Sequence, residues 1–194
     1  MQALLIDIDG VLYVGDEAIP GAAEAIGWLD AQRVPYLFVT NTTSRPRADL
    51  GEGWDFATLN RAFRYLMRKP QPALVALGMT RYWRAPDGLR LDTAPFVMAL
   101  AHAAAAEPVV LGKPAAAFFA AALETLATSA ATTLMIGDDI RGDVLGAQDC
   151  GLPAILVRTG KFREDDLAGD IVPLAVLDSI AALPPWWEQQ ASTD

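Results

Sequence analysis

Ala3-Leu4-Leu5-Ile6-Asp7-Ile8-Asp9-Gly10 is the stretch of sequence that decides the fold. Its apolar run has the length of a strand and ends in two acidic residues and a glycine. A continuous run of this kind is typical of a strand buried on both faces, as in a parallel sheet covered by helices. Gly10 allows the backbone to turn and approach a ligand. We therefore predict a buried strand whose end presents the carboxylates of Asp7 and Asp9 to one loop region.

The same pattern recurs along the chain. Apolar runs of strand length alternate with helical stretches, and most of these strands also end in polar residues. Such alternation predicts an α/β fold with a doubly wound parallel sheet, in which ligands bind beyond the carboxyl ends of the strands. The further predicted strands are 35–39, 132–136 and 154–157, and the predicted helices around them are 22–32, 115–127 and a short one at 143–149.

Residues 46–108 differ from this pattern and read as an insertion. They contain helical pieces, a strand-like run and a turn at Pro86-Asp87-Gly88, without an internal repeat. We expect residues 1–45 and 109–194 to form one catalytic core. The predicted elements of the insertion are helices at 57–68 and 95–106 and a strand at 73–77.

The composition excludes several classes of function. The chain has 194 residues, 15 Lys plus Arg against 24 Asp plus Glu, a net charge of -9 and 53% hydrophobic residues. The acidic balance argues against general attraction to nucleic acids or anionic membranes. The single cysteine, Cys150, cannot form an intramolecular disulfide, and the early acidic residues break a signal-peptide pattern. We expect a soluble cytoplasmic protein.

Aspartates gather at the ends of two predicted strands, and these are Asp7, Asp9, Asp138, Asp139 and Asp143. Several carboxylates in one crevice raise one another's pKa unless a cation neutralises them. Mg²⁺ suits a site made of one or two carboxylates and a substrate phosphate. A single aspartate in such a loop is as readily explained as a cap or turn residue. The whole set favours a Mg²⁺ site.

Two weaker signals point to an anionic substrate. Thr40 and Asn41 follow the second strand, where hydroxyl and backbone N–H groups suit phosphate oxygens. Lys113 precedes a helix, where its charge could offset a phosphate or a carboxylate. Taken alone, each has an ordinary explanation as a turn or a solvated lysine.

Four stretches in order resemble the motifs of the haloacid dehalogenase-like (HAD) hydrolases. They are Asp7-Ile8-Asp9-Gly10-Val11-Leu12-Tyr13, Thr40-Asn41-Thr42, Gly112-Lys113-Pro114 and Gly137-Asp138-Asp139-Ile140-Arg141-Gly142-Asp143. The chain is most similar to the NagD-like branch, which includes 4-nitrophenylphosphatases and phospholysine phosphohistidine inorganic pyrophosphate phosphatases. Stretches such as Thr159-Gly160-Lys161-Phe162 read like that branch.

The resemblance implies a role for each acidic residue. Asp7 would be the nucleophile that forms an aspartyl-phosphate, and Asp9 would act as general acid and then general base. Mg²⁺ would be held by the Asp7 carboxylate, the Asp9 backbone carbonyl and the Asp138 carboxylate. The supporting residues would be Asp139, Asp143 and Gly10.

The resemblance also implies how the substrate is held. Thr40 and the backbone of Asn41 would bind the phosphoryl oxygens, and Lys113 would offset the charge on the nucleophile and the phosphate. Such a division of labour suits phosphoryl transfer, which depends on positioning and on cations around the equatorial oxygens.

The insertion is shorter than the α/β cap of the NagD-like branch. Either the cap is naturally truncated, which would leave an open site for larger substrates such as phosphoproteins, or a stretch near Leu50-Gly51 has been lost. Apolar surface left by a short cap is a reason to expect a homodimer.

The sequence therefore favours a Mg²⁺-dependent phosphatase of small phosphomonoesters, phosphoramidates or pyrophosphate compounds. The alternative is a catalytically weak or inactive scaffold of the same fold, supported by the short insertion. A phosphoacceptor receiver domain shares the acidic sheet end, but receivers are shorter and lack an insertion.

Overall fold

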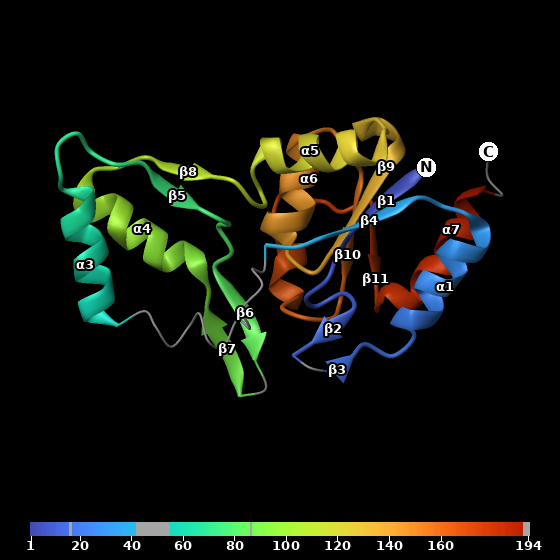
Figure 1. Ribbon diagram of the computed structural model, residues 1–194. Helices are drawn as coiled ribbons and strands as arrows, with labels where there is room; N and C mark the ends of the chain where they lie inside the picture. The colour runs from blue at the N-terminus through green and yellow to red at the C-terminus, as the bar shows by residue number, and fades with distance from the viewer. Residues whose placement is uncertain (16, 42–54, 86, 192–194) are drawn as a thin grey trace.

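The computed structural model describes residues 1–15, 17–41, 55–85 and 87–191. Two lobes lie side by side, a larger one built around a sheet and a narrower one that contains α3 and α4 (Figure 1). The predictions that concern Thr42 and the Leu50-Gly51 junction fall outside the described residues.

The larger lobe contains a five-stranded sheet in which every neighbouring pair is parallel. This confirms the predicted α/β fold class. The chain leaves β1 to form β4 on one side of it and later returns to form β9 on the other, so β1 lies at a topological switch point, where α/β sheets bind ligands. The order across the sheet is β11 (Ala175–Leu177), β10 (Ala154–Val157), β9 (Thr133–Gly137), β1 (Ala3–Asp7) and β4 (Tyr36–Val39).

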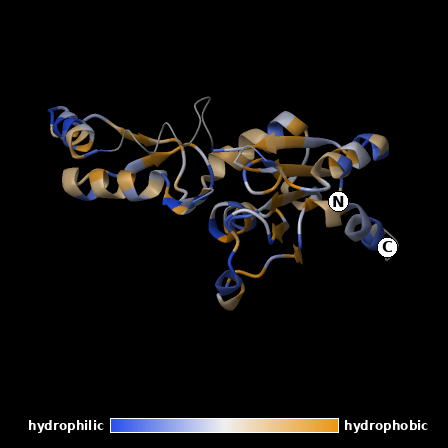
Figure 2. Cartoon of the chain, turned by 90° about the horizontal axis from the view of Figure 1, so that it is seen from below, coloured by the Kyte–Doolittle hydropathy of each residue, from blue (hydrophilic) through white to orange (hydrophobic). Residues whose placement is uncertain are grey.

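The strands are apolar on both faces because helices cover both faces. In β1, Leu4 and Ile6 belong to one buried cluster and Leu5 to the other. α1 (Ala22–Gln32) and α7 (Leu183–Ala191) cover the first face, and α5 (Ala116–Leu126) and α6 (Gly146–Asp149) cover the second. Figure 2 shows these strands as hydrophobic segments within the larger lobe. The alternation of side chains along each strand thus separates two cores.

The narrower lobe is built from the middle of the chain. α3 (Phe56–Leu66) and α4 (Thr93–Ala104) pack beside a two-stranded parallel sheet of β5 (Leu74–Ala76) and β8 (Pro108–Val110). Asp55 caps the N-terminus of α3, and its side chain accepts a hydrogen bond from the backbone N–H of Thr58 at 2.7 Å. The helices share a small apolar cluster of their own.

An antiparallel hairpin, β6 (Tyr82–Ala85) and β7 (Gly88–Leu91), also comes from the middle of the chain and lies between the two lobes (Figure 1). The predicted turn at residues 86–88 falls between these strands, with Gly88 as the first residue of β7 and Pro86 outside the described residues. The remaining elements are short, and they are β2 (Tyr13–Val14), β3 (Glu17–Ala18), η1 (Ala130–Thr132), η2 (Ile140–Leu145), η3 (Glu164–Ala168) and η4 (Ile180–Ala182).

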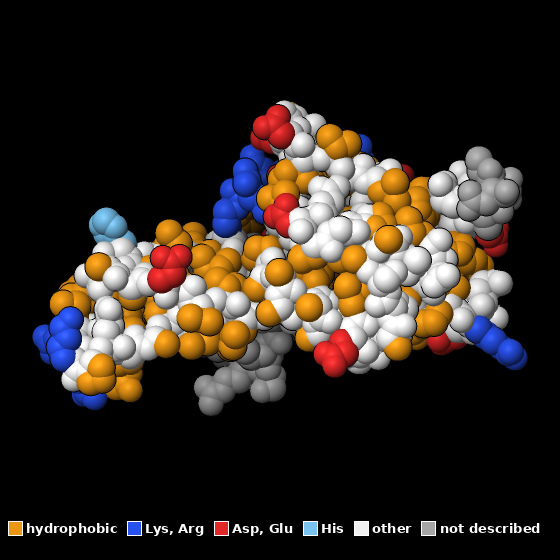
Figure 3. Space-filling view, turned by 90° about the horizontal axis from the view of Figure 1, so that it is seen from above, with side chains coloured by type: hydrophobic (Ala, Val, Ile, Leu, Met, Phe, Trp, Pro, Cys, Tyr) orange, Lys and Arg blue, Asp and Glu red, His pale blue; other side chains and the backbone are white. Residues whose placement is uncertain are grey.

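The only histidine of the sequence is a surface residue. His102 lies exposed on α4 of the narrower lobe (Figure 3). Trp186 and Trp187 of α7 pack against the core of the larger lobe and anchor the end of the described chain. Within the described residues, no helix is both long and apolar enough to cross a membrane.

Candidate active site

The parallel strands bring three acidic side chains together at one edge of the sheet. Asp7 ends β1, Asp138 follows β9, and Asp143 comes from η2. One carboxylate oxygen from each lies within 4.8 Å of the others, and all three residues are buried. The ends of β1 and β9, which the sequence marks with acids, therefore contribute to one cluster.

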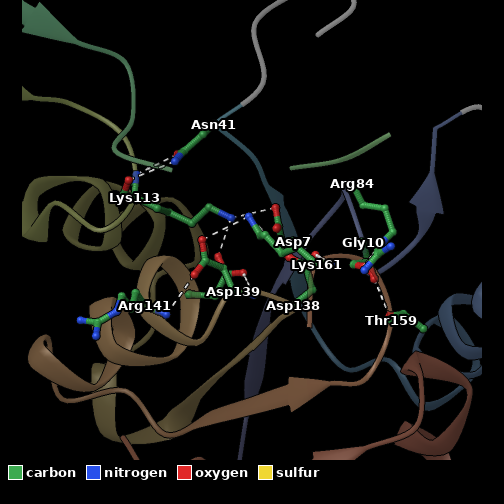
Figure 4. Close-up of polar contacts among 12 residues, drawn as sticks. Asp7, Gly10, Asn41, Arg84, Lys113, Asp138, Asp139, Arg141, Thr159 and Lys161 are labelled. Atoms are coloured by element: carbon green, nitrogen blue, oxygen red, sulfur yellow. Dashed lines mark hydrogen bonds and ion pairs between the residues drawn. The ribbon is translucent and has the colours of Figure 1, made fainter. Parts of the chain in front are cut away.

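A buried lysine joins two of these acids. Lys113 comes from the loop between β8 and α5, and its Nζ lies 2.7 Å from Asp7 Oδ1 and 2.7 Å from Asp143 Oδ1 (Figure 4). Burial alone would lower the pKa of Lys113, but the carboxylates of Asp143 and Asp7 raise it above its usual value. The lysine is therefore a permanent positive charge beside Asp7 rather than a solvated surface residue.

Asp138 lies in a cradle between two glycines. Gly10 and Gly160 both have positive φ, at 83° and 63°. A Cβ on either residue would come within 2.0 Å of Asp138 Oδ2. The other oxygen, Oδ1, is buried and has no hydrogen-bond partner among the described residues. An unpartnered buried carboxylate oxygen is costly unless a cation binds it.

Burial raises the pKa of two of these acids. The pKa of Asp138 reaches about 8 because burial outweighs the nearby charge of Lys161. The pKa of Asp7 reaches about 6 because burial outweighs the ion pair with Lys113. Near neutral pH, Asp138 therefore resists ionisation until a further positive charge approaches, whereas Asp7 is mostly ionised beside Lys113.

The turn after β9 fixes the third acid. Asp139 caps η2 by accepting a hydrogen bond from the backbone N–H of Arg141 at 3.0 Å. Its own backbone N–H donates to Asp143 Oδ2 at 3.1 Å, and the backbone N–H of Asp143 donates to the Asp139 carbonyl at 2.9 Å. One carboxylate oxygen of Asp143 thus pairs with Lys113, and the other accepts a hydrogen bond from the backbone of the turn. Asp139 lies outside the three-acid cluster.

Three other predicted residues lie around this cluster. Asp9 lies in the loop after β1, where its backbone forms an isolated β-bridge with Tyr13. Its side chain is not in the three-acid cluster. Thr40 and Asn41 follow β4 at the same edge of the sheet. The Asn41 side chain donates a hydrogen bond to the backbone carbonyl of Lys113 and accepts one from its backbone N–H. Asn41 therefore positions that lysine, a role that the sequence did not suggest.

The loop after β10 supplies residues to which sequence reasoning gave no role. Lys161 lies with its Nζ 3.1 Å from Asp139 Oδ2, and its backbone N–H donates to Asp138 Oδ2 at 2.8 Å. Arg84 of β6 donates from Nε to the Gly160 carbonyl at 2.8 Å and links the hairpin to this loop. The available signal was the stretch Thr159-Gly160-Lys161, which indicates a family resemblance but not a role at the acids.

The donor set suits a hard divalent cation. Asp7, Asp138 and Asp143 offer carboxylate oxygens, the ligand type that Mg²⁺ prefers. Such an ion would give a partner to the buried Oδ1 of Asp138, which has no hydrogen bond within the described residues. A small pocket beside this cluster is lined by both lysines, by Asn41 and Thr80, and by the acids Asp7, Asp139 and Asp143. The two ammonium groups therefore offset part of the negative charge where the acids converge.

Comparisons with known families and proteins agree with this geometry. Residues 4–55 match the family model "Haloacid dehalogenase-like hydrolase", and residues 110–183 match the model "HAD-hyrolase-like". The chain is 33% identical to phospholysine phosphohistidine inorganic pyrophosphate phosphatase of Bos taurus over 232 residues, which cover 86% of each chain. It is 32% identical to haloacid dehalogenase-like hydrolase domain-containing protein 2 of Homo sapiens over 228 residues, with 86% and 87% covered.

The bovine alignment is longer than the part of this chain that enters it. It spans 232 positions, whereas 86% of a 194-residue chain is fewer residues than that. The relative therefore has residues inside the aligned region that have no counterpart here.

Solved structures share the fold. NagD from E. coli K-12 superposes with a TM-score of 0.75 at 18% identity, covering 93% of this chain and 97% of that chain. A 4-nitrophenylphosphatase from Thermotoga maritima gives a TM-score of 0.81 at 16% identity, covering 95% and 97%. Together with an acidic cluster at the sheet's switch point and more than 30% identity to relatives over most of the chain, these matches show that the chain belongs to the haloacid dehalogenase-like hydrolase family.

Proposed function

We propose that this protein is a Mg²⁺-dependent phosphatase that works through an aspartyl-phosphate on Asp7. The observation that carries the proposal is the ion pair of Asp7 with the buried Lys113, placed beside two further buried acids. A carboxylate held by a lysine in a low-dielectric pocket is positioned to attack phosphorus, while the lysine offsets the charge that gathers there.

The other residues of the site divide the remaining tasks. Asp9 lies in the loop directly after Asp7 and is proposed to donate a proton to the leaving oxygen and later to accept one from water. Thr40 and the backbone of Asn41 are proposed to hold the phosphoryl oxygens. Lys113 keeps its proton throughout, because the two carboxylates it contacts raise its pKa.

Mg²⁺ is proposed to bind the carboxylates of Asp7 and Asp138 and the backbone carbonyl of Asp9. When bound, the ion supplies positive charge to the phosphoryl group. Asp143 and Asp139 support the site, because Asp143 bonds both Lys113 and the turn that carries Asp139. Gly10 leaves the space that the Asp138 carboxylate occupies.

The substrate is proposed to be a small phosphorylated compound. The names of the relatives support phosphoamino acids and inorganic pyrophosphate as the first compounds to test. We propose that residues 1–45 and 109–194 form the catalytic core and that 46–108 form a shortened cap. The separate apolar cluster around α3 and α4 supports this division, and Arg84 brings the insertion into contact with the core loop at Gly160.

Self-association is the remaining proposal, with a homodimer as the expected state. Its support is the open face of the narrower lobe, where the paired residues Val75 of β5 and Val109 of β8 are each about half exposed (50% and 49%). Adjacent apolar side chains on a two-stranded sheet are a surface that a second copy could cover.

The test of the proposed chemistry is the Asp7→Asn variant. We expect Mg²⁺-dependent hydrolysis of p-nitrophenyl phosphate to fall by at least about a thousandfold, since the nucleophile is lost. Asp149→Asn removes one exposed carboxylate from α6 and is the control for charge. Native-rate hydrolysis by Asp7→Asn would exclude the mechanism.

A second measurement does not depend on turnover. Beryllofluoride with Mg²⁺ mimics a phosphoryl group on an aspartate and should raise the melting temperature of the wild type and of Asp149→Asn. Asp7→Asn should show no such increase. An unchanged melting temperature in the wild type would favour the alternative of an inactive scaffold.

A further inference from the structure

Lys161 places a second, largely buried ammonium group at the acid cluster. Its side chain is 11% exposed, and its Nζ lies 3.1 Å from Asp139 Oδ2 and 3.9 Å from Asp138 Oδ1. In Figure 4 the side chains of Lys161 and Lys113 both point toward the acids, from different sides of the site. The two lysines therefore divide the acids between them, because Lys113 bonds Asp7 and Asp143.

The backbone fixes the direction of Lys161. The Thr159 hydroxyl donates to the carbonyl of Gly10, and Gly160 packs so tightly that a Cβ would lie 2.5 Å from Gly10 Cα. The N–H of Lys161 donates to Asp138 Oδ2 at 2.8 Å. These contacts do not involve the ammonium group, so the loop would direct the side chain toward the acids even without the ion pair.

With all four carboxylates ionised, the charges at this site leave room for one divalent cation. Four carboxylates, those of Asp7, Asp138, Asp139 and Asp143, face two ammonium groups. Asp138 Oδ1 is buried and makes no hydrogen bond within the described residues, and the nearest cation to it is Lys161 at 3.9 Å. A metal ion bound to that oxygen would lie close to the Lys161 ammonium and would be repelled by it.

We infer that Lys161 is the counter-ion of Asp139 in the metal-free protein, and that a divalent ion bound at Asp138 competes with its ammonium group for the space beside that carboxylate. The inference rests on the proposed metal site. Lys161 is then a positioning residue that keeps the acids together before metal binds and that limits metal affinity. A lysine that simply braced the acidic turn would have the opposite effect, because its loss would weaken metal binding.

Lys161→Met tests the inference by direct measurement of metal binding. Methionine keeps an unbranched apolar stem and removes the charge. After treatment with a chelator, the variant should melt at a lower temperature than the wild type, but calorimetry should show Mg²⁺ binding roughly tenfold or more tighter, because a like charge beside the ion has been removed. Lys69→Met, an exposed residue between α3 and β5, is the matched control and should change neither quantity.

Unchanged or weaker Mg²⁺ binding by Lys161→Met would overturn the inference and leave the proposed phosphatase intact. Failure of the wild type to bind Mg²⁺ at all would remove the inference and the metal part of the proposed function together. The two failures are therefore distinguishable.

A second experiment uses only the wild type, so it holds even if the variant fails to fold. Acetic anhydride labels free amines, and mass spectrometry quantifies the label on each lysine. Saturating Mg²⁺ should increase the labelling of Lys161 severalfold, because the displaced ammonium reaches solvent, while the labelling of Lys69 stays constant. Equal labelling of Lys161 with and without Mg²⁺ would contradict displacement.

Discussion

The side chain of Asn41 holds the backbone of Lys113 through a pair of hydrogen bonds. Asn41 Nδ2 donates to the Lys113 carbonyl at 3.0 Å, and the Lys113 N–H donates to Asn41 Oδ1 at 2.8 Å. The two residues are 72 positions apart in the chain. One comes from the end of β4 and the other from the return of the chain into the larger lobe, so this pair sets where the lysine meets Asp7.

Asn41→Ala should therefore impair catalysis through Lys113. The substitution leaves a partly buried N–H and carbonyl without their partner, which costs about 1–3 kcal/mol of folding stability. We expect kcat to fall and the melting temperature to drop modestly. Asn60→Ala, which changes the only other asparagine, on α3, is the control. Full activity in Asn41→Ala would show that Lys113 does not need this anchor.

Gly160→Ala should damage the site more than its backbone conformation alone explains. Its φ is +63° and its Cβ would lie 2.0 Å from Asp138 Oδ2. Gly15 has nearly the same φ, +62°, but a Cβ there would meet no atom within 4 Å. Gly15→Ala should cost about 1 kcal/mol for the left-handed backbone, as measured by urea unfolding. Gly160→Ala should cost clearly more and should also weaken Mg²⁺ binding; equal effects would argue against the cradle.

Metal removal and pH should act through Asp138. Its folded-state pKa of about 8 lies above its ordinary value of 3.8, so the folded metal-free protein holds a proton that the unfolded chain releases. Stability in the presence of a chelator should fall as pH rises from about 4 toward 8. Asp138→Asn should flatten the high-pH end of this dependence, which thermal melts between pH 6 and 9 would measure. Asp7, with a pKa of about 6, affects the pH dependence of stability mainly below pH 6.

Mg²⁺ binding should have the opposite pH dependence. The ion requires the ionised carboxylate, so its affinity should weaken as pH falls below about 8 and protons compete for Asp138. Calorimetry in buffers of different ionisation enthalpy would detect the released proton. A pH-independent affinity between 6 and 8 would contradict Asp138 as a ligand.

Val75→Lys should separate a homodimer into monomers. Val75 is half exposed and lies opposite Val109 in the β5–β8 pair. A lysine there would leave a charge inside an apolar interface. Light scattering after size exclusion would show the change in mass, with Val172→Lys, at an exposed position of the larger lobe, as the control. A monomeric wild type would refute the dimer directly.

Much of the fold could be predicted because its strands are buried on both faces. Apart from Asp7 and Thr133, the runs that form β1, β9 and β10 are apolar, and the acids at the ends of two of them mark the sheet edge that carries the site. The helix predicted at 22–32 has those bounds in the structure. The apolar pattern of such a strand lies within a few consecutive residues, which is why the sequence predicts it.

Other features could not be predicted from the sequence, because they depend on contacts between loops that are far apart along the chain. Asn41 reaches Lys113, and Lys161 reaches Asp139, across long separations in the sequence. A polar residue after a strand looks the same in the sequence whether it binds a ligand or holds a neighbouring backbone. Only the arrangement of the three loops distinguishes the two.

The alternation of side chains along β1 has a consequence for catalysis. Leu4 and Ile6 are anchored in one core and Leu5 in the other, so the strand cannot rotate or slide by one position without exchanging the two. Asp7 is the next residue along, and its carboxylate takes its direction from that register. The direction of the proposed nucleophile is thus set by two leucines and an isoleucine that are buried in the cores, away from any substrate.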